Sequence, residues 1–279
     1  MISEMIRELR RAAIAVILLV CAAAALGQSN TYLQLQPKAI EDRLKQFAGS
    51  NRDRELTLKS MFQEAGCSNS RLKEQAVAKS NAPNLSCTLA GTGGDVIVVG
   101  AHFDYVPAGE GVVDNWSGAS LLPSLYQSLS QKPRRHTFVF VSFTDEEKGF
   151  VGSRSYVAEL GEGETKHIKA MIDIDTLGLG PTEIWVSNSD PGLVEDLFAY
   201  ASEEKLRVKT MNVDGFGNSD GQSFKARHIP IITLHSVTNE TLRILHTKRD
   251  NLSAMRLGDY YDSYRLIAGY LAMLDSALK

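Results

Sequence analysis

The sequence of 279 residues lacks an excess of positive charge, an internal repeat, a heptad run and a low-complexity tract. Its formal net charge is −3 and its lysines and arginines are scattered, which argues against broad binding to nucleic acid. No stretch reads as a linker long enough to divide the chain. The hydrophobic fraction of 43% and the charged fraction of 23% are ordinary for a globular protein. We therefore expect one domain that buries a sizeable core.

No apolar run reaches the roughly 20 residues that a membrane-spanning helix needs. An apolar run at residues 12–26 follows a basic segment at residues 7–11 and ends in small residues. This order predicts a secretory signal peptide at residues 1–27 and a mature domain at residues 28–279. The alternative is an uncleaved membrane anchor. We expect an exported protein, periplasmic or secreted, that has no stable membrane insertion once the signal peptide is cleaved.

Cysteine is scarce, because only Cys67 and Cys87 remain once Cys21 is assigned to the signal segment. An even number of cysteines in an oxidising compartment favours a disulfide. The segment between the two residues is rich in serine and asparagine and has little core of its own, so a covalent link would stabilise it. The alternative is a pair of free cysteines.

Three near-continuous apolar runs are present: DVIVVG at 95–100, TFVFVSF at 137–143 and IPIITL at 229–234. Such runs are typical of strands that are covered on both faces. Shorter strands are expected at 71–77, 170–174 and 183–186, and helices at 38–66 (one or two), 117–129, 152–160, 191–204 and 259–278. Buried strands that alternate with helices predict an α/β layered sheet.

Polar residues follow the apolar strands at the ends where ligands gather in such sheets. The set comprises His102 and Asp104 after the first run, Glu146 and Glu147 after the second, Asp175 after residues 170–174, and Asp114 and His246 in loops. Each alone reads as a surface or turn residue. Together, carboxylates behind apolar strands would repel one another and be poorly solvated, and a divalent cation would compensate their charge.

The types of ligand indicate the metal. Imidazole and carboxylate without thiolate suit a catalytic zinc, with cobalt or manganese as substitutes. Five ligands are too many for one such zinc and too few for two separate sites, so two zinc ions sharing a carboxylate are expected. His102 and Asp175 would hold one ion, Glu147 and His246 the other, and Asp114 both.

Glu146 and Glu147 are adjacent, so their side chains diverge and only one of them is expected to bind metal. Glu146 would face the water between the ions and act as general base. Asp104 lies two residues after His102 and would accept the proton of the other imidazole nitrogen, which fixes the tautomer. The expected catalytic pair is therefore Glu146 and Asp104.

The polar motifs together resemble those of the zinc-dependent aminopeptidases of the bacterial leucyl aminopeptidase type, with glutaminyl cyclases and glutamate carboxypeptidases as relatives. The motifs are AHFD (101–104), DNWSG (114–118), DEEKGFVGS (145–153), DIDTLG (173–178), SDGQSF (219–224) and HTKRD (246–250). The similarity covers roughly residues 40–279. It implies the zinc exopeptidase fold, a three-layer α/β sandwich with a mixed, mostly parallel sheet flanked by helices.

The resemblance implies the same metal and base assignments. It favours Asp175 over Asp173 as the ligand, because Asp173 takes the position usually held by Asn. Two positions depart from the family: Gly221 stands where His is frequent, and Trp116 stands where a small or polar residue is usual. We expect both departures to affect substrate preference.

The expected function is a zinc metallopeptidase, an aminopeptidase that removes N-terminal residues from peptides as a monomer. Three alternatives remain open: a glutaminyl cyclase with one zinc, a non-catalytic binding relative, and a serine hydrolase based on Gly-x-Ser-x-Gly at 217–221. The polar, glycine-rich segment before that motif argues against the last. Among the other histidines, His136 and His167 are expected to be exposed. His235 is expected to be structural, with a place at the border of the pocket as the alternative.

Overall fold

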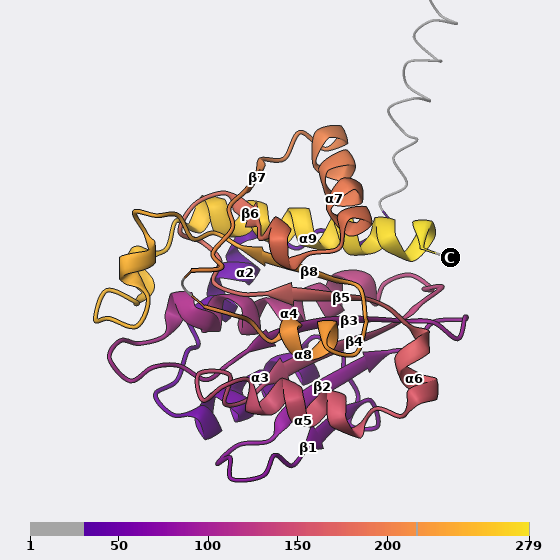
Figure 1. Cartoon of the computed structure of the whole chain (residues 1–279), viewed down its shortest axis with the longest axis horizontal. Coiled ribbons are helices and arrows are strands. Elements are labelled where there is room, and N and C mark those ends of the chain that lie inside the picture. The colour runs from indigo at the N-terminus through magenta and orange to yellow at the C-terminus, as the bar shows by residue number, and fades with distance from the viewer. Residues whose placement is uncertain (1–30, 216, 279) are drawn as a thin grey trace, which may run out of the picture. The chain divides into compact units, whose positions relative to one another are not determined.

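The structure, a computed structural model, describes residues 31–215 and 217–278 (Figure 1). The predicted signal peptide at residues 1–27 lies outside the described residues. The described residues from Tyr32 onward belong to one compact unit. In the described part of the chain, no helix combines the length and the apolar character needed to cross a membrane.

The described residues form a mixed eight-stranded sheet in the order β1-β2-β4-β3-β5-β8-β6-β7. The strands are β1 (Leu72–Gln75), β2 (Asn84–Leu89), β3 (Val96–His102), β4 (Thr137–Phe143), β5 (Ile168–Ile174), β6 (Thr182–Ile184), β7 (Val208–Thr210) and β8 (Ile231–His235). The central strands β4, β3, β5 and β8 run parallel, whereas β1, β2 and β6 pair antiparallel with their inner neighbours. The predicted α/β fold with a mixed, mostly parallel sheet is confirmed.

Helices cover both faces of this sheet. One face carries α2 (Pro37–Leu44), α3 (Asn51–Glu64), α4 (Ser117–Leu129), α7 (Pro191–Glu203) and α9 (Leu257–Ala277). The other carries α5 (Val151–Glu159), α6 (Glu162–His167) and α8 (Gly221–Lys225). Successive residues of a strand therefore serve different cores: Val99 joins the larger core and Val98 the smaller. This double coverage explains the near-continuous apolar runs.

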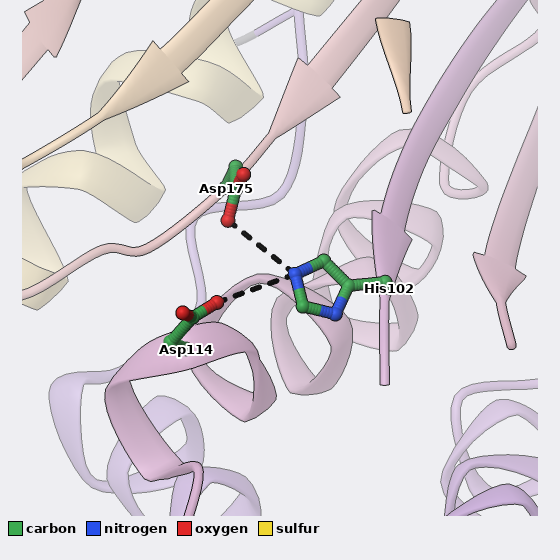
Figure 2. A group of neighbouring side chains, drawn as sticks. All are labelled: His102, Asp114 and Asp175. Carbon is green, nitrogen blue, oxygen red and sulfur yellow. Dashed lines mark ion pairs between the residues drawn. The ribbon is translucent and has the colours of Figure 1, made fainter. Parts of the chain in front are cut away.

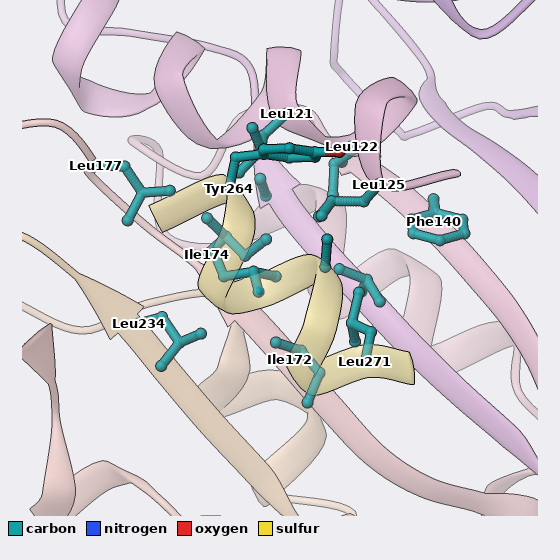
Figure 3. Close-up of a cluster of buried hydrophobic side chains, with 14 of the residues drawn as sticks. Leu121, Leu122, Leu125, Phe140, Ile172, Ile174, Leu177, Leu234, Tyr264 and Leu271 are labelled. Carbon is teal, nitrogen blue, oxygen red and sulfur yellow. The ribbon is translucent and has the colours of Figure 1, made fainter. Parts of the chain in front are cut away.

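The larger core lies between α4, α9 and the central strands (Figure 3). Tyr264 of α9 lies beside Leu121 and Leu122 of α4, Leu271 lies further along α9, and all four are buried. Burial of each such leucine stabilises the fold by about 1.5–3 kcal/mol. The packing covers one face of β3 and β5, two central strands from whose carboxyl ends polar motifs emerge.

Local signals explain where the first helices divide. The predicted helical stretch at 38–66 is two helices, because Ser50 interrupts it and caps α3 by accepting the N–H of Asp53 at 3.1 Å. The predicted strand at 183–186 ends at Ile184 and continues as a 3₁₀ turn.

The strand β2 was not predicted, although its sequence NLSCTL alternates polar and apolar residues as a half-buried strand does. It carries Cys87, whose disulfide to Cys67 is present as predicted. The bond fastens the segment after α3 to the sheet.

The prediction that His136 is exposed is wrong. His136 is 1% exposed, its backbone N–H donates to Asp275 Oδ1 at 2.8 Å, and its Nδ1 lies 3.3 Å from the same oxygen. The carboxylate comes from α9, far along the chain, and it makes burial of this polar residue tolerable. His167 is exposed, as expected.

Candidate active site

The site lies where parallel strands β3, β4 and β5 end side by side. His102 is the last residue of β3, Asp175 follows β5 directly, and the two glutamates Glu146 and Glu147 lie shortly after β4. Gly100 pairs with Asp173 and His102 with Phe143, so all three strands terminate at one edge. The sheet thus brings together residues that are more than 70 positions apart in the sequence.

A first group of possible metal ligands consists of His102, Asp114 and Asp175 (Figure 2). His102 Nε2 lies 3.3 Å from Asp114 Oδ1 and 3.5 Å from Asp175 Oδ1. Figure 2 shows the imidazole of His102 directed from β3 towards two carboxylates, that of Asp114 and that of Asp175. One nitrogen and two carboxylate oxygens face a single point, as a three-ligand metal site requires.

A second group consists of Asp114, Glu147 and His246. His246 Nε2 lies 3.1 Å from Asp114 Oδ2 and 3.1 Å from Glu147 Oε1. Asp114 therefore belongs to both groups, with Oδ1 facing His102 and Oδ2 facing His246. The five predicted ligands fall into the two predicted sets, and within each set the ligand atoms lie within 4.8 Å of one another.

The electrostatics of the site fit a divalent cation. Burial alone would raise the pKa of Asp114, yet hydrogen bonds to both imidazoles lower it below its usual range. For Glu146, burial together with the charges of Asp220, Asp175 and Asp114 raises the pKa to about 10, although His102 opposes the shift. The site thus concentrates more negative charge than its histidines compensate, and cations among these oxygen and nitrogen donors would restore the balance.

Asp104 does more than the predicted contact with His102. Its Oδ1 lies 3.4 Å from His102 Nδ1. The same carboxylate accepts the backbone N–H of Glu146 at Oδ1, 2.9 Å away, and that of Glu147 at Oδ2, 3.1 Å away. This buried side chain therefore orients the loop after β4 as well as the imidazole.

Asn115 ties the loop after β5 to the turn that carries Asp114. Its Oδ1 accepts the N–H of Gly118 at 2.9 Å and of Thr176 at 3.0 Å, and its Nδ2 donates to the carbonyl of Ile174. Thr176 has φ +64°, a conformation that β-branched residues rarely adopt. Strain of this kind persists where surrounding contacts enforce it, and here those contacts position Asp175.

Two supporting residues were missed by sequence reasoning. Asp250 accepts the N–H of Val113 at 2.7 Å and of Asp114 at 3.2 Å, and its place in the HTKRD motif could have indicated this role. Arg54 is fully buried in α3 and donates to the carbonyls of Phe103 and Gly111, both at 3.1 Å. An arginine in an amphipathic helix normally reads as exposed, so the sequence carried no signal for it.

Comparison with known proteins agrees with this geometry. The model of the family described as Peptidase family M28 matches residues 84–271, well over half of the chain. The chain belongs to peptidase family M28. It is 29% identical over 137 residues to aminopeptidase YwaD of Bacillus subtilis (strain 168), covering 47% of this chain and 30% of the relative. The chain spans about a third of the length of the first curated relatives it matches.

Solved structures share the fold of this M28 chain. BSAP, a zinc aminopeptidase from Bacillus subtilis, superposes with a TM-score of 0.63 at 22% identity, over 70% of this chain and 50% of the other. A glutaminyl cyclase from an Acidobacteriales bacterium superposes with a TM-score of 0.74 at 18% identity, over 88% of this chain and 96% of the other. At these identities the likeness establishes the fold alone.

The M28 chain has a cavity of about 320 Å³ beside both ligand groups. Its acidic wall comprises Asp114, Glu146, Glu147 and Asp175. Its apolar wall comprises Phe150, Trp185, Val213, Val237, Leu242 and Leu245. A cavity that joins a cluster of metal-binding donors to an apolar wall is typical of an enzyme active site.

Neither predicted departure from the family lines this cavity. Trp116 is fully buried and its Nε1 donates to the carbonyl of Leu44 at 2.9 Å. Gly221 is buried, its N–H donates to Asp173 Oδ2 at 3.1 Å, and a Cβ there would meet that oxygen at 2.9 Å. The two residues support the framework and do not line the cavity, and the expectation that they affect substrate preference stays a prediction.

The serine hydrolase alternative has no support in the M28 chain. Ser219 is buried, and among the described residues no histidine lies within hydrogen-bond distance of its hydroxyl. The preceding strand β7 ends at Thr210, well before the motif, so the strand-turn-helix of a nucleophile elbow is missing. His235 borders the cavity, and its nitrogens are engaged within the fold: Nδ1 accepts from Val237 N–H and Nε2 donates to the carbonyl of Met211.

Proposed function

We propose that this M28 chain is an exported two-zinc aminopeptidase that removes N-terminal residues from peptides. The observation that carries the proposal is the position of Asp114, whose two oxygens each face a different histidine at 3.3 and 3.1 Å. A carboxylate with one oxygen in each of two ligand groups suits two ions about 3.5–4 Å apart. YwaD, an aminopeptidase, supports the reaction class.

The donor set agrees with zinc, because it combines imidazole nitrogens with carboxylate oxygens and no thiolate. His102, Asp114 and Asp175 would hold one ion, and Asp114, Glu147 and His246 the other. Bound zinc would supply a water of lowered pKa and would stabilise the negative charge that develops on the substrate carbonyl. The apolar wall of the cavity would receive the side chain of the residue to be released.

Glu146 is proposed as the general base. Glu146 lines the same cavity as the two ligand groups, but it belongs to neither group. Its carboxylate would take a proton from the attacking water and later give it to the departing amine. Burial and neighbouring carboxylates raise its pKa to about 10 without metal, and positive charge nearby favours the ionised base that catalysis needs. Asp104 would hold Glu146 in place through the backbone.

Export and a monomeric state are part of the proposal. The disulfide between Cys67 and Cys87 supports export, because such bonds persist in oxidising compartments.

Metal analysis joined to a substrate screen tests the function. Full-length protein purified without chelators should contain two zinc ions per chain. It should cleave peptides with a free N-terminus and leave their N-acetylated forms intact. Cleavage of both forms at equal rates would contradict an aminopeptidase, and zinc-free protein with full activity would contradict the metal mechanism.

A second candidate is glutaminyl cyclase chemistry with one zinc. The observation that favours it is the unequal exposure of the two ligand groups. His102 is 3% exposed, whereas the side chain of His246 is 53% exposed, so the second group would hold its ion less tightly. One zinc per chain together with release of ammonia from glutaminyl peptides would replace the first proposal by this one.

A further inference from the structure

A second cavity, of about 450 Å³, adjoins the metal-binding cavity. Phe150 and Asn218 line both, so the two hollows form neighbouring compartments on either side of these residues. Phe150 precedes α5 with φ +60°, and its carbonyl accepts the N–H of Arg154 in the first turn. The second volume falls within the range of about 300–1,000 Å³ that is typical of small-molecule sites.

The two compartments carry opposite charge. Four carboxylates line the metal-binding cavity. The described residues that line the second cavity include two arginines, Arg154 and Arg227, and no acidic residue. Gln222, Ser223 and Asn218 add uncharged hydrogen-bonding groups. A molecule that occupies both compartments would therefore meet an acidic end and a basic end.

The two arginines differ in their engagement. Arg227 is held in place because it donates to the carbonyls of Val157 and Leu160 and to Thr165 Oγ1, at 3.3–3.4 Å. Arg154 is exposed, and its guanidinium lies over the ring of Phe150, 5.8 Å from the centroid. Within the described residues Arg154 has no ion-pair partner. It is thus a cation available to a ligand in the second cavity, beside the shared residue Phe150.

We propose that the second cavity is a subsite for a carboxylate on the part of the peptide that follows the cleaved bond, with Arg154 as the binding residue. This proposal rests on the aminopeptidase function proposed above. The planar guanidinium presents paired donors that match a carboxylate, and Arg227 adds fixed positive charge. The favoured substrates are short peptides, whose C-terminal carboxylate reaches the subsite while the N-terminus lies at the acidic wall.

A carboxylate at this place has two chemical sources. It is either the C-terminus of a short peptide or an aspartate or glutamate side chain of a longer one. Peptides Leu-Ala, Leu-Ala-Ala and Leu-Ala-Ala-Ala, each as free acid and as C-terminal amide, report the first source. Leu-Ala-Glu-Ala-amide against Leu-Ala-Gln-Ala-amide reports the second. The peptide length with the strongest preference for the acid indicates where the subsite lies along the chain.

The experiment compares kcat/KM of the zinc-loaded, full-length protein for each matched pair. In the wild type we expect kcat/KM to be roughly fivefold to tenfold higher for the carboxylate peptide than for its uncharged match, in one of the two kinds of pair. The preference is no larger because the guanidinium is partly solvated and salt screens its attraction to the carboxylate. In Arg154→Gln the ratio should fall to about one, and in Arg154→Lys it should be partly retained. Added salt should lower the wild-type ratio.

Arg71→Gln is the matched control, because Arg71 is an exposed arginine that lines neither cavity. It should keep the wild-type ratio. A binding measurement removes the dependence on turnover. In calorimetry with the Glu146→Gln protein, the carboxylate member of the preferred pair should bind more tightly than its uncharged match, and the added Arg154→Gln change should abolish the difference.

The two proposals fail differently. Equal efficiency within every matched pair, acid against amide and Glu against Gln, in wild type and Arg154→Gln alike, overturns the subsite and leaves the aminopeptidase function standing. Absence of cleavage of every peptide overturns the function, and calorimetry then decides whether the carboxylate site exists. Equal binding of the two members of every matched pair overturns the site in either case.

Discussion

Asp104 Oδ1 accepts the backbone N–H of Glu146 at 2.9 Å, which links the loop after β3 to the loop after β4. Because the same carboxylate accepts the N–H of Glu147 and faces His102, it contacts the proposed base and the segments of two proposed metal ligands. One buried acid therefore sets the relative position of three functional groups. A substitution of Asp104 is therefore expected to disturb several functional groups at once.

Asp104→Asn should weaken zinc binding by roughly 10–100-fold, the usual effect of losing a group that orients a ligand. The new amide nitrogen would face a backbone N–H that now has an acceptor, so one of two hydrogen bonds is lost. Zinc affinity measured by competition with a chelator tests this. Asp42→Asn, on an exposed i,i+4 pair with Lys38, is the control and should bind zinc as the wild type does.

Glu146→Gln should retain zinc while kcat falls by about 10²–10⁴-fold, because the amide keeps the shape of the side chain and cannot take a proton. Zinc content and steady-state kinetics of one preparation measure both quantities. Near-normal turnover would remove Glu146 from the role of base. Loss of zinc together with activity would show that it holds metal instead.

Zinc binding should strengthen as the pH rises. Hydrogen bonds to Asp114 and Glu147 raise the pKa of His246 to about 10 in the metal-free site. Below that pH the imidazole is protonated without metal, and it must lose the proton to bind zinc. For each proton released on binding, the zinc affinity rises by up to about tenfold per pH unit. Chelator competition at about pH 6 and about pH 8 measures the slope, and a flat profile would contradict the assigned ligand role.

Gly221→Ala should destabilise the fold by about 1–3 kcal/mol, because the added Cβ would meet Asp173 Oδ2 at 2.9 Å in a buried setting. Gly215→Ala, in the segment before α8, is the control, since nothing lies within 4 Å of a Cβ there. Thermal unfolding of the two variants should differ clearly. Equal melting temperatures would show that Asp173 and α8 shift freely to make room.

The sequence was sufficient for the α/β class, because strands covered on both faces must be apolar along their whole length. It was also sufficient to nominate the ligands, since polar residues directly after such strands lie at the edge where parallel strands end. The disulfide followed from the even count of cysteines. These inferences depend on local pattern or composition, which the chain carries residue by residue.

Other features depended on residues brought together from far along the chain. The burial of His136 requires Asp275 from α9, and the buried Arg54 requires carbonyls from the loop after β3. Trp116 and Gly221 proved to be framework residues because packing partners, and not spacing, determine which side chains line a cavity. The pairing of each oxygen of Asp114 with its own histidine was likewise decided only by tertiary structure, since sequence order carries no information about which oxygen faces which ligand group.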